Sequence, residues 1–245
     1  MTAARSAAAH IFVVDLDRPE PDEDDWYHLR RVLRLRPGEL ISAADGKGRW
    51  RMCRMATEAH LIEPDDVVIE EAAPARLVAV GFAPVKGDRP EWTVQKLTEL
   101  GVDLIVPFTA ARSVVRWDAD RQAHHLQRLR RVAREAAMQA RRTWLPEVAD
   151  LTDFPGARAR LRAAGADGPA GVALAEPGGD PVDGANRAVL VGPEGGWSPE
   201  ELGTGLPTVG LTSSILRSET AAVAAGVLLC ALREGRVAPR GPRSA

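Results

Sequence analysis

Two polar turns in the last third of the chain hold the residues best suited to bind a ligand. The first turn has the sequence GPEGG at residues 192–196 and follows the apolar run 188–191, which predicts a strand buried on both faces. The second has the sequence LTSSILRSETA at residues 211–221; it ends a short apolar run and opens a helix. Ligands of open α/β sheets bind at the carboxyl ends of neighbouring strands. The two turns together therefore predict one ligand site.

The composition of the first turn restricts the class of ligand. The chain has no GxxxxGK(S/T) run, and GPEGG lacks the GxGxxG spacing of dinucleotide-binding turns. Because Glu194 would repel a phosphate, the turn favours a neutral or cationic ligand. Gly192, Gly195 and Gly196 allow the backbone to approach that ligand closely. Residues 198–201 read SPEE, a capping box that predicts a helix directly after the turn.

The overall composition limits the kinds of protein that the chain can be. With 245 residues, of which 45% are hydrophobic, it can form one large domain or two ordinary ones. Its formal net charge is −2, which argues against a protein that coats nucleic acid over its whole surface. A local basic face is still compatible, because acids gather at 20–25 and 63–71 whereas arginines gather at 30–36 and 121–142.

The cysteines and the apolar runs indicate the compartment. Cys53 and Cys230 are far apart and form no CxxC motif, so we expect neither a metal site nor a disulfide framework, which suits a reducing cytoplasm. Residues 1–9 have no long apolar core and predict no signal peptide. The apolar run 221–232 is too short to span a bilayer and predicts a buried helix.

The first seventy residues predict a small β-barrel, because short segments with strand character follow one another closely. The sequence DGKG at 45–48 predicts a hairpin turn. The sequence AAPA at 72–75 marks the expected domain boundary. The expected strands are 10–16, 40–44, 50–55, 59–62 and 67–70, and the expected helix is 26–35.

After this boundary, strands alternate with helices, which predicts βαβ units and a parallel sheet. We expect the first helix to end at Gly101. We expect Asp118 or Asp120 to cap a long helix that reaches about residue 142, and the next helix to start near Asp153. The expected strands are 77–82, 102–107, 172–175, 188–191 and 209–211, the other expected helices are 91–100 and 152–164, and a loop is expected at 176–179.

GPEGG followed by ILRSETA resembles the ribosomal RNA small-subunit methyltransferase E family. These are knotted SPOUT-class enzymes that methylate N3 of a uridine with S-adenosyl-L-methionine. The other segments that resemble the family are HLRRVLR at 28–34, PGE at 37–39, DGKG at 45–48, QKLTELG at 95–101 and EAAMQARR at 135–142. The resemblance implies an α/β fold with a SPOUT-type knotted parallel sheet and helices on both faces, preceded by a PUA-like β-barrel. It implies an RNA-binding domain at 1–73 and a methyltransferase domain with a trefoil knot at 74–245.

The resemblance also implies roles for individual residues. Uridine N3 must lose a proton, and either a base or a cation that stabilises the resulting anion would help. Arg217 fits the second role, and Glu194 is the other catalytic candidate. The implied cofactor-binding residues are Glu176, Gly192, Pro193, Glu194, Gly195, Gly196, Leu211, Ser214, Ile215, Leu216 and Thr220. The implied RNA-binding residues are Arg30, Arg34, Lys86, Lys96, Arg112, Gln139 and Arg142.

The implied partners are the RNA of the small ribosomal subunit and a second copy of the chain, bound through the carboxyl-terminal domain. Neither a membrane nor a metal ion is implied. The chain departs from the family pattern at four positions: Tyr27 replaces a histidine, Met138 a glutamate, Thr212 a glycine and Ser214 a basic residue.

Alternative interpretations remain open. An inactive RNA- or ribosome-binding module of the same fold, or a SPOUT methyltransferase acting on another RNA, would also carry these motifs; a nucleotide-phosphate enzyme has no lysine or metal-binding acids to support it. Lys96 and Glu99 also suit an ordinary helix ion pair. Glu219 suits a pair with Arg217 or a helix cap. The arginines of 121–142 suit a solvated helix face as well as an RNA surface, and the segment 176–179 suits a plain surface turn.

Overall fold

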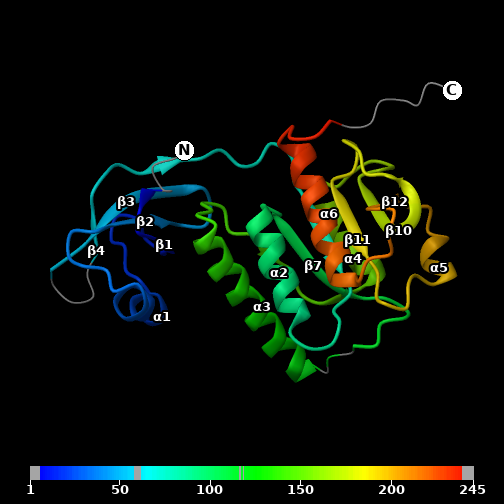
Figure 1. The fold of residues 1–245 in the computed structure, drawn as a ribbon, viewed down its shortest axis with the longest axis horizontal. Helices are drawn as coiled ribbons and strands as arrows, with labels where there is room; N and C mark the ends of the chain where they lie inside the picture. The colour runs from blue at the N-terminus through cyan, green and yellow to red at the C-terminus, as the bar shows by residue number, and fades with distance from the viewer. Residues whose placement is uncertain (1–5, 58–61, 116, 118, 239–245) are drawn as a thin grey trace. The chain divides into compact units, whose positions relative to one another are not determined.

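The computed structural model describes residues 6–57, 62–115, 117 and 119–238 (Figure 1). The chain forms two compact units. The first comprises Met1–Ala75 together with Arg134–Leu145, and the second comprises Arg76–Ala133 together with Pro146–Ala245. The sequence predicted a boundary between residues 73 and 74. It did not predict that residues 134–145 return to the first unit.

The first unit is built on a five-stranded sheet with the order β1-β2-β3-β4, in which β5 also pairs with β3. β1 runs parallel to β2 and the other pairs are antiparallel. Gly46 and Gly48 have φ angles of 74° and 91° and form the tight turn from β2 to β3, as the DGKG motif predicted. The strands are β1 (Ala9–Phe12), β2 (Leu40–Ala44), β3 (Arg49–Met55), β4 (Ile62–Pro64) and β5 (Ile69–Glu70). Most of the expected strand 59–62 lies outside the described residues.

The helix of the first unit differs from the expected span 26–35. An α-helix, α1 (Glu23–Tyr27), is followed directly by a π-helical turn, η2 (His28–Val32). The helix begins earlier because the carboxylate of Asp22 accepts a hydrogen bond of 2.8 Å from the backbone N–H of Asp25, which caps the first turn. It ends before Arg34, whose φ of 55° is left-handed.

The returning segment completes the core of the first unit. Ala137 and Met138 pack in the same apolar cluster as Leu29, Ile41 and Trp50. The first unit therefore obtains part of its core from residues more than sixty positions beyond its own strands.

Buried polar contacts also tie this segment to the first unit. His10 Nε2 donates a hydrogen bond of 2.9 Å to the carbonyl oxygen of Arg142, and its Nδ1 lies 2.8 Å from the hydroxyl oxygen of Ser42. The Arg134 guanidinium pairs with the buried carboxylate of Asp25 and, at 3.2 Å, with Asp22. The returning segment is thus held by specific contacts as well as by apolar packing.

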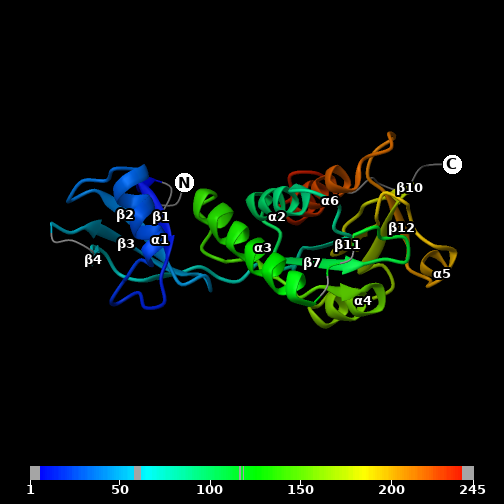
Figure 2. The same ribbon diagram turned by 90° about the horizontal axis from the view of Figure 1, so that it is seen from below.

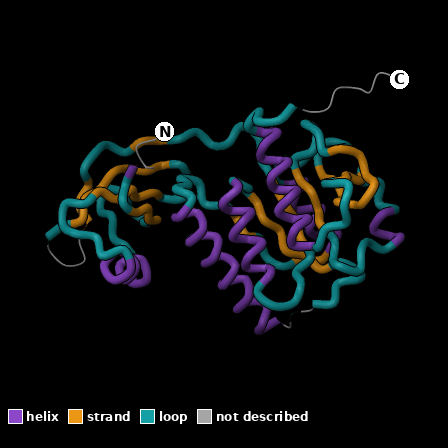
Figure 3. Tube along the Cα trace, viewed as in Figure 1, coloured by secondary structure: helices purple, strands orange, loops and turns teal. Residues whose placement is uncertain are grey.

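The second unit is built on a sheet with the order β12-β10-β11-β6-β7-β8, in which every neighbouring pair is parallel. Helices separate most of its strands along the chain, although β8 leads to β9 and β10 leads to β11 without a helix between them (Figure 3). The strands are β6 (Ala79–Phe82), β7 (Leu104–Thr109), β8 (Glu147–Val148), β9 (Thr152–Asp153, beside β7), β10 (Val172–Pro181), β11 (Ala188–Val191) and β12 (Thr208–Gly210). The helices are α2 (Arg89–Leu100), α3 (Ala119–Gln139), α4 (Phe154–Ala163), α5 (Pro199–Leu202) and α6 (Ser218–Arg233); the last residues of α3 belong to the first unit.

Helices cover both faces of this sheet, as Figure 2 shows for α2 and α6 on one side and α4 on the other. The apolar run of β11 serves both faces in alternation. Val189 and Val191 pack in the cluster that contains side chains of α2 and α6, whereas Ala188 and Leu190 pack in the cluster that contains side chains of α4. The uniformly apolar sequence of the strand follows from this double burial.

Local capping signals placed the helix ends correctly. Gly101 ends α2 with a left-handed φ of 98°. Asp153 caps α4, and the capping box formed by Ser198 and Glu201 opens α5. The predicted cap at Asp118 or Asp120 falls on side chains outside the described residues.

The loop expected at 176–179 was wrong, because this segment continues β10. The register of β10 against β12 shifts between Ala175 and Asp180, so the segment forms an irregular stretch of the strand. A side chain at Gly179 would lie 2.7 Å from the backbone of Thr208 and Val209. Glycine at this position permits the close approach of the two strands.

Within the described part of the chain, no helix is both long and apolar enough to cross a bilayer. The described residues also contain no cluster of three or more histidine, cysteine or acidic side chains that could hold a metal ion.

Burial of His10 predicts that the first unit loses stability in mild acid. Burial, together with the nearby charge of Arg141, lowers the pKa of His10 from 6.5 to about 4, although its bond to the Arg142 carbonyl opposes the shift. Between these two values the unfolded chain binds a proton that the folded chain excludes, so stability falls as the pH decreases. The expected loss from this residue is about 2 kcal/mol between pH 7 and pH 5.

Urea unfolding at both pH values, for the wild type and for His10→Gln, measures this loss. The difference between pH 7 and pH 5 should be smaller in the variant, because glutamine does not titrate. An equal pH dependence in both proteins would contradict the assignment of His10 as a buried neutral side chain.

Candidate functional site

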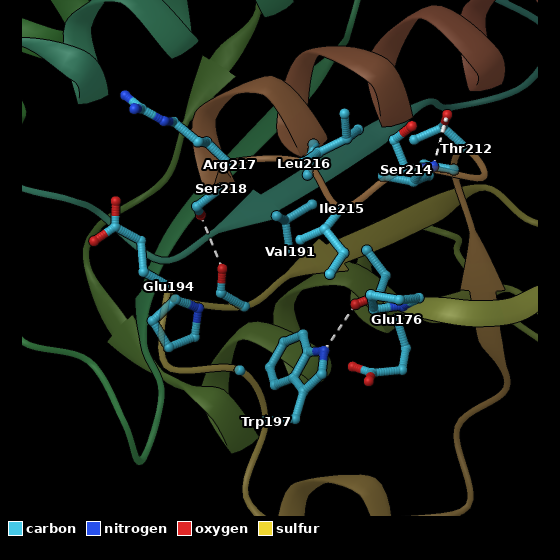
Figure 4. A pocket seen from close by; sticks show the side chains of 17 residues that line it. Glu176, Val191, Glu194, Trp197, Thr212, Ser214, Ile215, Leu216, Arg217 and Ser218 are labelled. Carbon is cyan, nitrogen blue, oxygen red and sulfur yellow. Dashed lines mark hydrogen bonds between the residues drawn. The ribbon is translucent and has the colours of Figure 1, made fainter.

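A pocket of about 330 Å³ lies where β10, β11 and β12 lead into their following segments (Figure 4). Each of the two turns identified from the sequence supplies one part of its wall, and the irregular stretch of β10 supplies a third. The lining residues are Ala175, Glu176, Pro177, Val191, Gly192, Pro193, Glu194, Gly196, Trp197, Leu211, Thr212, Ser214, Ile215, Leu216, Arg217, Ser218 and Ala221. The parallel sheet therefore brings together segments that are more than forty residues apart in sequence.

Trp197 forms a buried wall of this pocket and contacts residues of β7, of β10 and of the turn after β11. Its indole Nε1–H donates a hydrogen bond of 2.9 Å to the carbonyl oxygen of Ala175 in β10. Its ring stacks on Phe108 of β7, with centroids 6.0 Å apart and planes 7° from parallel. A side chain at Gly192, directly after β11, would lie 3.0 Å from the indole. The glycine thus makes room for the tryptophan.

A second contact joins the two polar turns. The Ser218 hydroxyl donates a hydrogen bond of 2.8 Å to the carbonyl oxygen of Gly192 (Figure 4). Ser218 is buried and is the first residue of α6, so the start of this helix is fixed against the GPEGG turn. The preceding Ile215 lines the pocket with a side chain that is 87% exposed, and it provides an apolar surface that a ligand can cover.

Charged side chains surround one edge of the pocket. Glu194 and Arg217 both extend toward this edge and away from Trp197 (Figure 4). The guanidinium of Arg89, at the start of α2, lies 3.2 Å from the Glu194 carboxylate and 3.6 Å from that of Glu219. Glu219 therefore pairs with Arg89 and not with Arg217, which was one of the two roles that the sequence suggested for it. The exposed guanidinium of Arg217 makes no hydrogen bond or ion pair with another described residue.

Nine of the eleven residues predicted to bind the cofactor line the pocket, as does the catalytic candidate Arg217; Gly195 and Thr220 do not. The carbonyl oxygen of Gly195 instead accepts a hydrogen bond of 3.2 Å from Arg112. Thr220 is an exposed residue of α6. Sequence reasoning missed Trp197 and Ser218, although both lie next to predicted residues and a tryptophan directly after a glycine turn is itself a signal of burial.

The residues predicted to bind RNA in the first unit do not all have free side chains. Arg30 lies over the ring of Trp26, with 5.5 Å between its guanidinium carbon and the ring centroid. Arg34 and Gln139 are exposed. The backbone of Arg142 is held by His10.

The predicted RNA-binding residues of the second unit are Lys86, Lys96 and Arg112. Lys86 is exposed. Lys96 forms an ion pair of 2.8 Å with Glu99 on the same helix, as one interpretation of the sequence expected. Arg112 is exposed and contacts the GPEGG turn through Gly195, as described above.

Several arginines of α3 have acidic partners from other elements. Arg128 lies 3.1 Å from Glu91 of α2, and Arg130 lies 2.7 Å from Asp150. The sequence of the helix alone therefore overstates its available positive charge, because these acidic partners lie outside the helix.

Models of known families match most of the chain. An RNA methyltransferase domain matches residues 72–229, and an RNA methyltransferase PUA domain matches residues 22–60. The chain is 34% identical over 221 residues to the ribosomal RNA small subunit methyltransferase E of Mycobacterium tuberculosis, covering 83% of this chain and 82% of that protein. It is 33% identical over 139 residues to the protein of the same name from Bacillus subtilis, covering 54% and 52% of the two chains.

Solved structures share the fold. The ribosomal RNA small subunit methyltransferase E of Neisseria gonorrhoeae, bound to S-adenosyl methionine, matches with a TM-score of 0.72 and 27% identity over 89% of this chain and 94% of that chain. A putative methyltransferase of Legionella pneumophila, in complex with the same cofactor, matches with a TM-score of 0.76 and 25% identity over 91% and 96% of the two chains.

These matches confirm the predicted fold class, a SPOUT-type parallel α/β sheet preceded by a PUA domain. The trefoil knot and the homodimer stay predictions. The family models and the relatives agree over most of the chain, and the chain therefore belongs to the ribosomal RNA small subunit methyltransferase E family.

Proposed function

We propose that this protein transfers a methyl group from S-adenosyl-L-methionine to N3 of a uridine in the RNA of the small ribosomal subunit. The observation that carries the proposal is a largely apolar pocket at three strand ends, with the guanidinium of Arg217 at its edge and unpaired among the residues that the structure describes. The names of the relatives and the cofactor bound in two solved neighbours support it. The cytoplasm as its location and the homodimer are parts of the same proposal.

The residues of the pocket fit this cofactor. A volume of about 330 Å³ is in the range of small-molecule sites. Trp197, Leu211 and Leu216 offer an apolar wall for an adenine ring. The carboxylates of Glu176 and Glu194 are the lining groups suited to hydroxyl groups and to positive charge, which agrees with a cationic ligand.

When bound, the cofactor supplies a methyl group on a positively charged sulfur. The residues of this chain must orient the uracil and stabilise the charge that N3 develops as it loses its proton. Arg217 is always charged, and its guanidinium can donate hydrogen bonds to a uracil carbonyl oxygen or to a phosphate. Glu194 lines the same edge and is the candidate to accept the proton.

RNA phosphates would be bound by the basic and polar residues predicted from the sequence, which occur in both units. Phosphate contacts position RNA and weaken as salt rises. We assign this role to Arg30, Arg34, Gln139 and Arg142 of the first unit and to Lys86, Lys96 and Arg112 of the second.

The reaction is tested with small ribosomal subunits from cells that lack this protein, labelled S-adenosyl-L-methionine and identification of the product nucleoside. We expect 3-methyluridine. Methylation of a different RNA would favour the alternative substrate, and binding of RNA and cofactor without transfer would favour the inactive binding module.

The role of Arg217 predicts a loss of activity without a loss of cofactor. Arg217→Ala should lower kcat/KM for RNA by about 10²- to 10³-fold, because the variant lacks a donor aimed at developing charge. Affinity for S-adenosyl-L-methionine, measured by calorimetry, should stay within about twofold. Arg217→Lys should be intermediate, because an ammonium lacks the planar fork of the guanidinium. Wild-type activity in Arg217→Ala would contradict the assignment.

The role of Trp197 predicts a combined loss of binding and stability. Trp197→Phe removes the donor to the Ala175 carbonyl and leaves a gap beside Gly192. We expect cofactor affinity to fall about tenfold and the free energy of unfolding to fall by about 1–3 kcal/mol. Trp92→Phe, at a tryptophan of α2 that is 43% exposed, is the matched control and should change neither quantity. A cofactor affinity unchanged in Trp197→Phe would show that the indole does not shape the site.

A further inference from the structure

Arg89 contacts both acidic groups that border the pocket edge. Its Nη1 lies 3.2 Å from Oε1 of Glu194, and its Nε lies 3.6 Å from Oε1 of Glu219. Glu194 belongs to the GPEGG turn and Glu219 to the first turn of α6, so one guanidinium spans the two segments that build the pocket. Two carboxylates can share one arginine because its donors point in several fixed directions.

The two carboxylates differ in how much they depend on Arg89. The Glu219 side chain is 12% exposed and its other oxygen is buried without a hydrogen-bond partner among the described residues. The Glu194 side chain is 59% exposed, and Arg89 is its only hydrogen-bond or ion-pair partner among the described residues. Glu194 is consequently the less buried member of the set, and Arg89 is the contact that sets its direction.

Arg217 lines the pocket at this edge, and its guanidinium is unpaired among the described residues. Without Arg89, the exposed carboxylate of Glu194 would be attracted to Arg217, which carries the opposite charge and lines the same pocket. An ion pair between Glu194 and Arg217 would occupy the guanidinium N–H donors of Arg217, which the proposed function assigns to RNA.

We propose that Arg89 is a positioning residue that holds Glu194 away from Arg217 and so keeps the Arg217 guanidinium available to the RNA. This role rests on one part of the proposed function, namely that Arg217 contacts RNA. It assigns Arg89 an effect on RNA binding that acts through Glu194, and it does not depend on which group accepts the proton.

A separate contact, from Arg112, holds the backbone of the GPEGG turn. Arg112 donates to the backbone carbonyl of Gly195, so the path of the GPEGG backbone has its own restraint. Arg89 acts on the carboxylate of Glu194 rather than on the backbone that carries it. Removal of Arg89 should therefore redirect one side chain and leave the cofactor wall in place.

The test measures the dissociation constant of a small-subunit ribosomal RNA transcript at one fixed salt concentration. Arg89→Met should weaken RNA binding about fivefold, the size expected for one competing surface ion pair. Arg89→Met combined with Glu194→Gln should return the affinity to within about twofold of wild type, because the glutamine amide carries no charge to capture Arg217. Affinity for S-adenosyl-L-methionine should stay within about twofold in Arg89→Met, because Arg89 does not line the pocket.

Matched controls separate this role from a simple change of net charge. Arg89→Met with Glu200→Gln has the same net charge as the rescue variant, but Glu200 does not line the pocket, so RNA binding should stay weak. Arg160→Met removes an arginine of α4 that pairs at 2.5 Å with Glu147 of β8, and it should change RNA affinity less than twofold. Equal rescue by Glu200→Gln and Glu194→Gln, or no weakening in Arg89→Met, would overturn the proposal.

Arg89→Lys covers the case in which Arg89→Met does not fold because Glu219 loses its partner. Lysine keeps the charge but cannot contact both carboxylates as a fork does, so weaker RNA binding that Glu194→Gln reverses would support the same role. If Arg89→Met does not fold and Arg89→Lys binds RNA as tightly as the wild type, the proposal is overturned. Binding is measured without methyl transfer, so a wild type that makes no 3-methyluridine contradicts the proposed function and leaves the role of Arg89 to these affinities.

Discussion

The position of the Trp197 indole is the constraint on which the pocket depends. A buried indole N–H needs an acceptor, and the Ala175 carbonyl in the irregular part of β10 needs a donor, so each satisfies the other. The same ring fills the space left by the missing side chain of Gly192 and stacks on Phe108. The indole thereby joins β7, β10 and the turn that follows β11, and the bond from Ser218 to Gly192 adds the start of α6 to the same assembly.

The sequence predicted those features whose causes are local. A buried parallel strand needs apolar residues on both faces, and a helix end needs a capping group within a few residues, so β11, Gly101, Asp153 and the capping box at Ser198 could all be identified from short patterns. The convergence of the two polar turns followed from the general geometry of parallel sheets.

The features that could not be predicted depend on partners far apart in the chain. Arg89 meets Glu194 across more than one hundred residues, and Arg134 meets Asp25 across a similar distance, so neither pair leaves a pattern of spacing. The segment at Glu176 was misjudged for a related reason: its glycines permit a turn, but the neighbouring strand β12 makes an irregular strand the better-bonded choice. The family resemblance located the important residues without showing these long-range contacts.

The return of the chain to the first unit has a consequence for the order in which the protein can fold during synthesis. The five strands of that unit are complete by Glu70, yet Ala137 and Met138 belong to its core and Arg134 neutralises its buried Asp25. The core of the amino-terminal unit is therefore incomplete until about seventy further residues have emerged from the ribosome. For the same reason the unit is not one continuous segment of the sequence. A gene fragment that ends after Ala75 would encode an incomplete core and not a module that folds by itself.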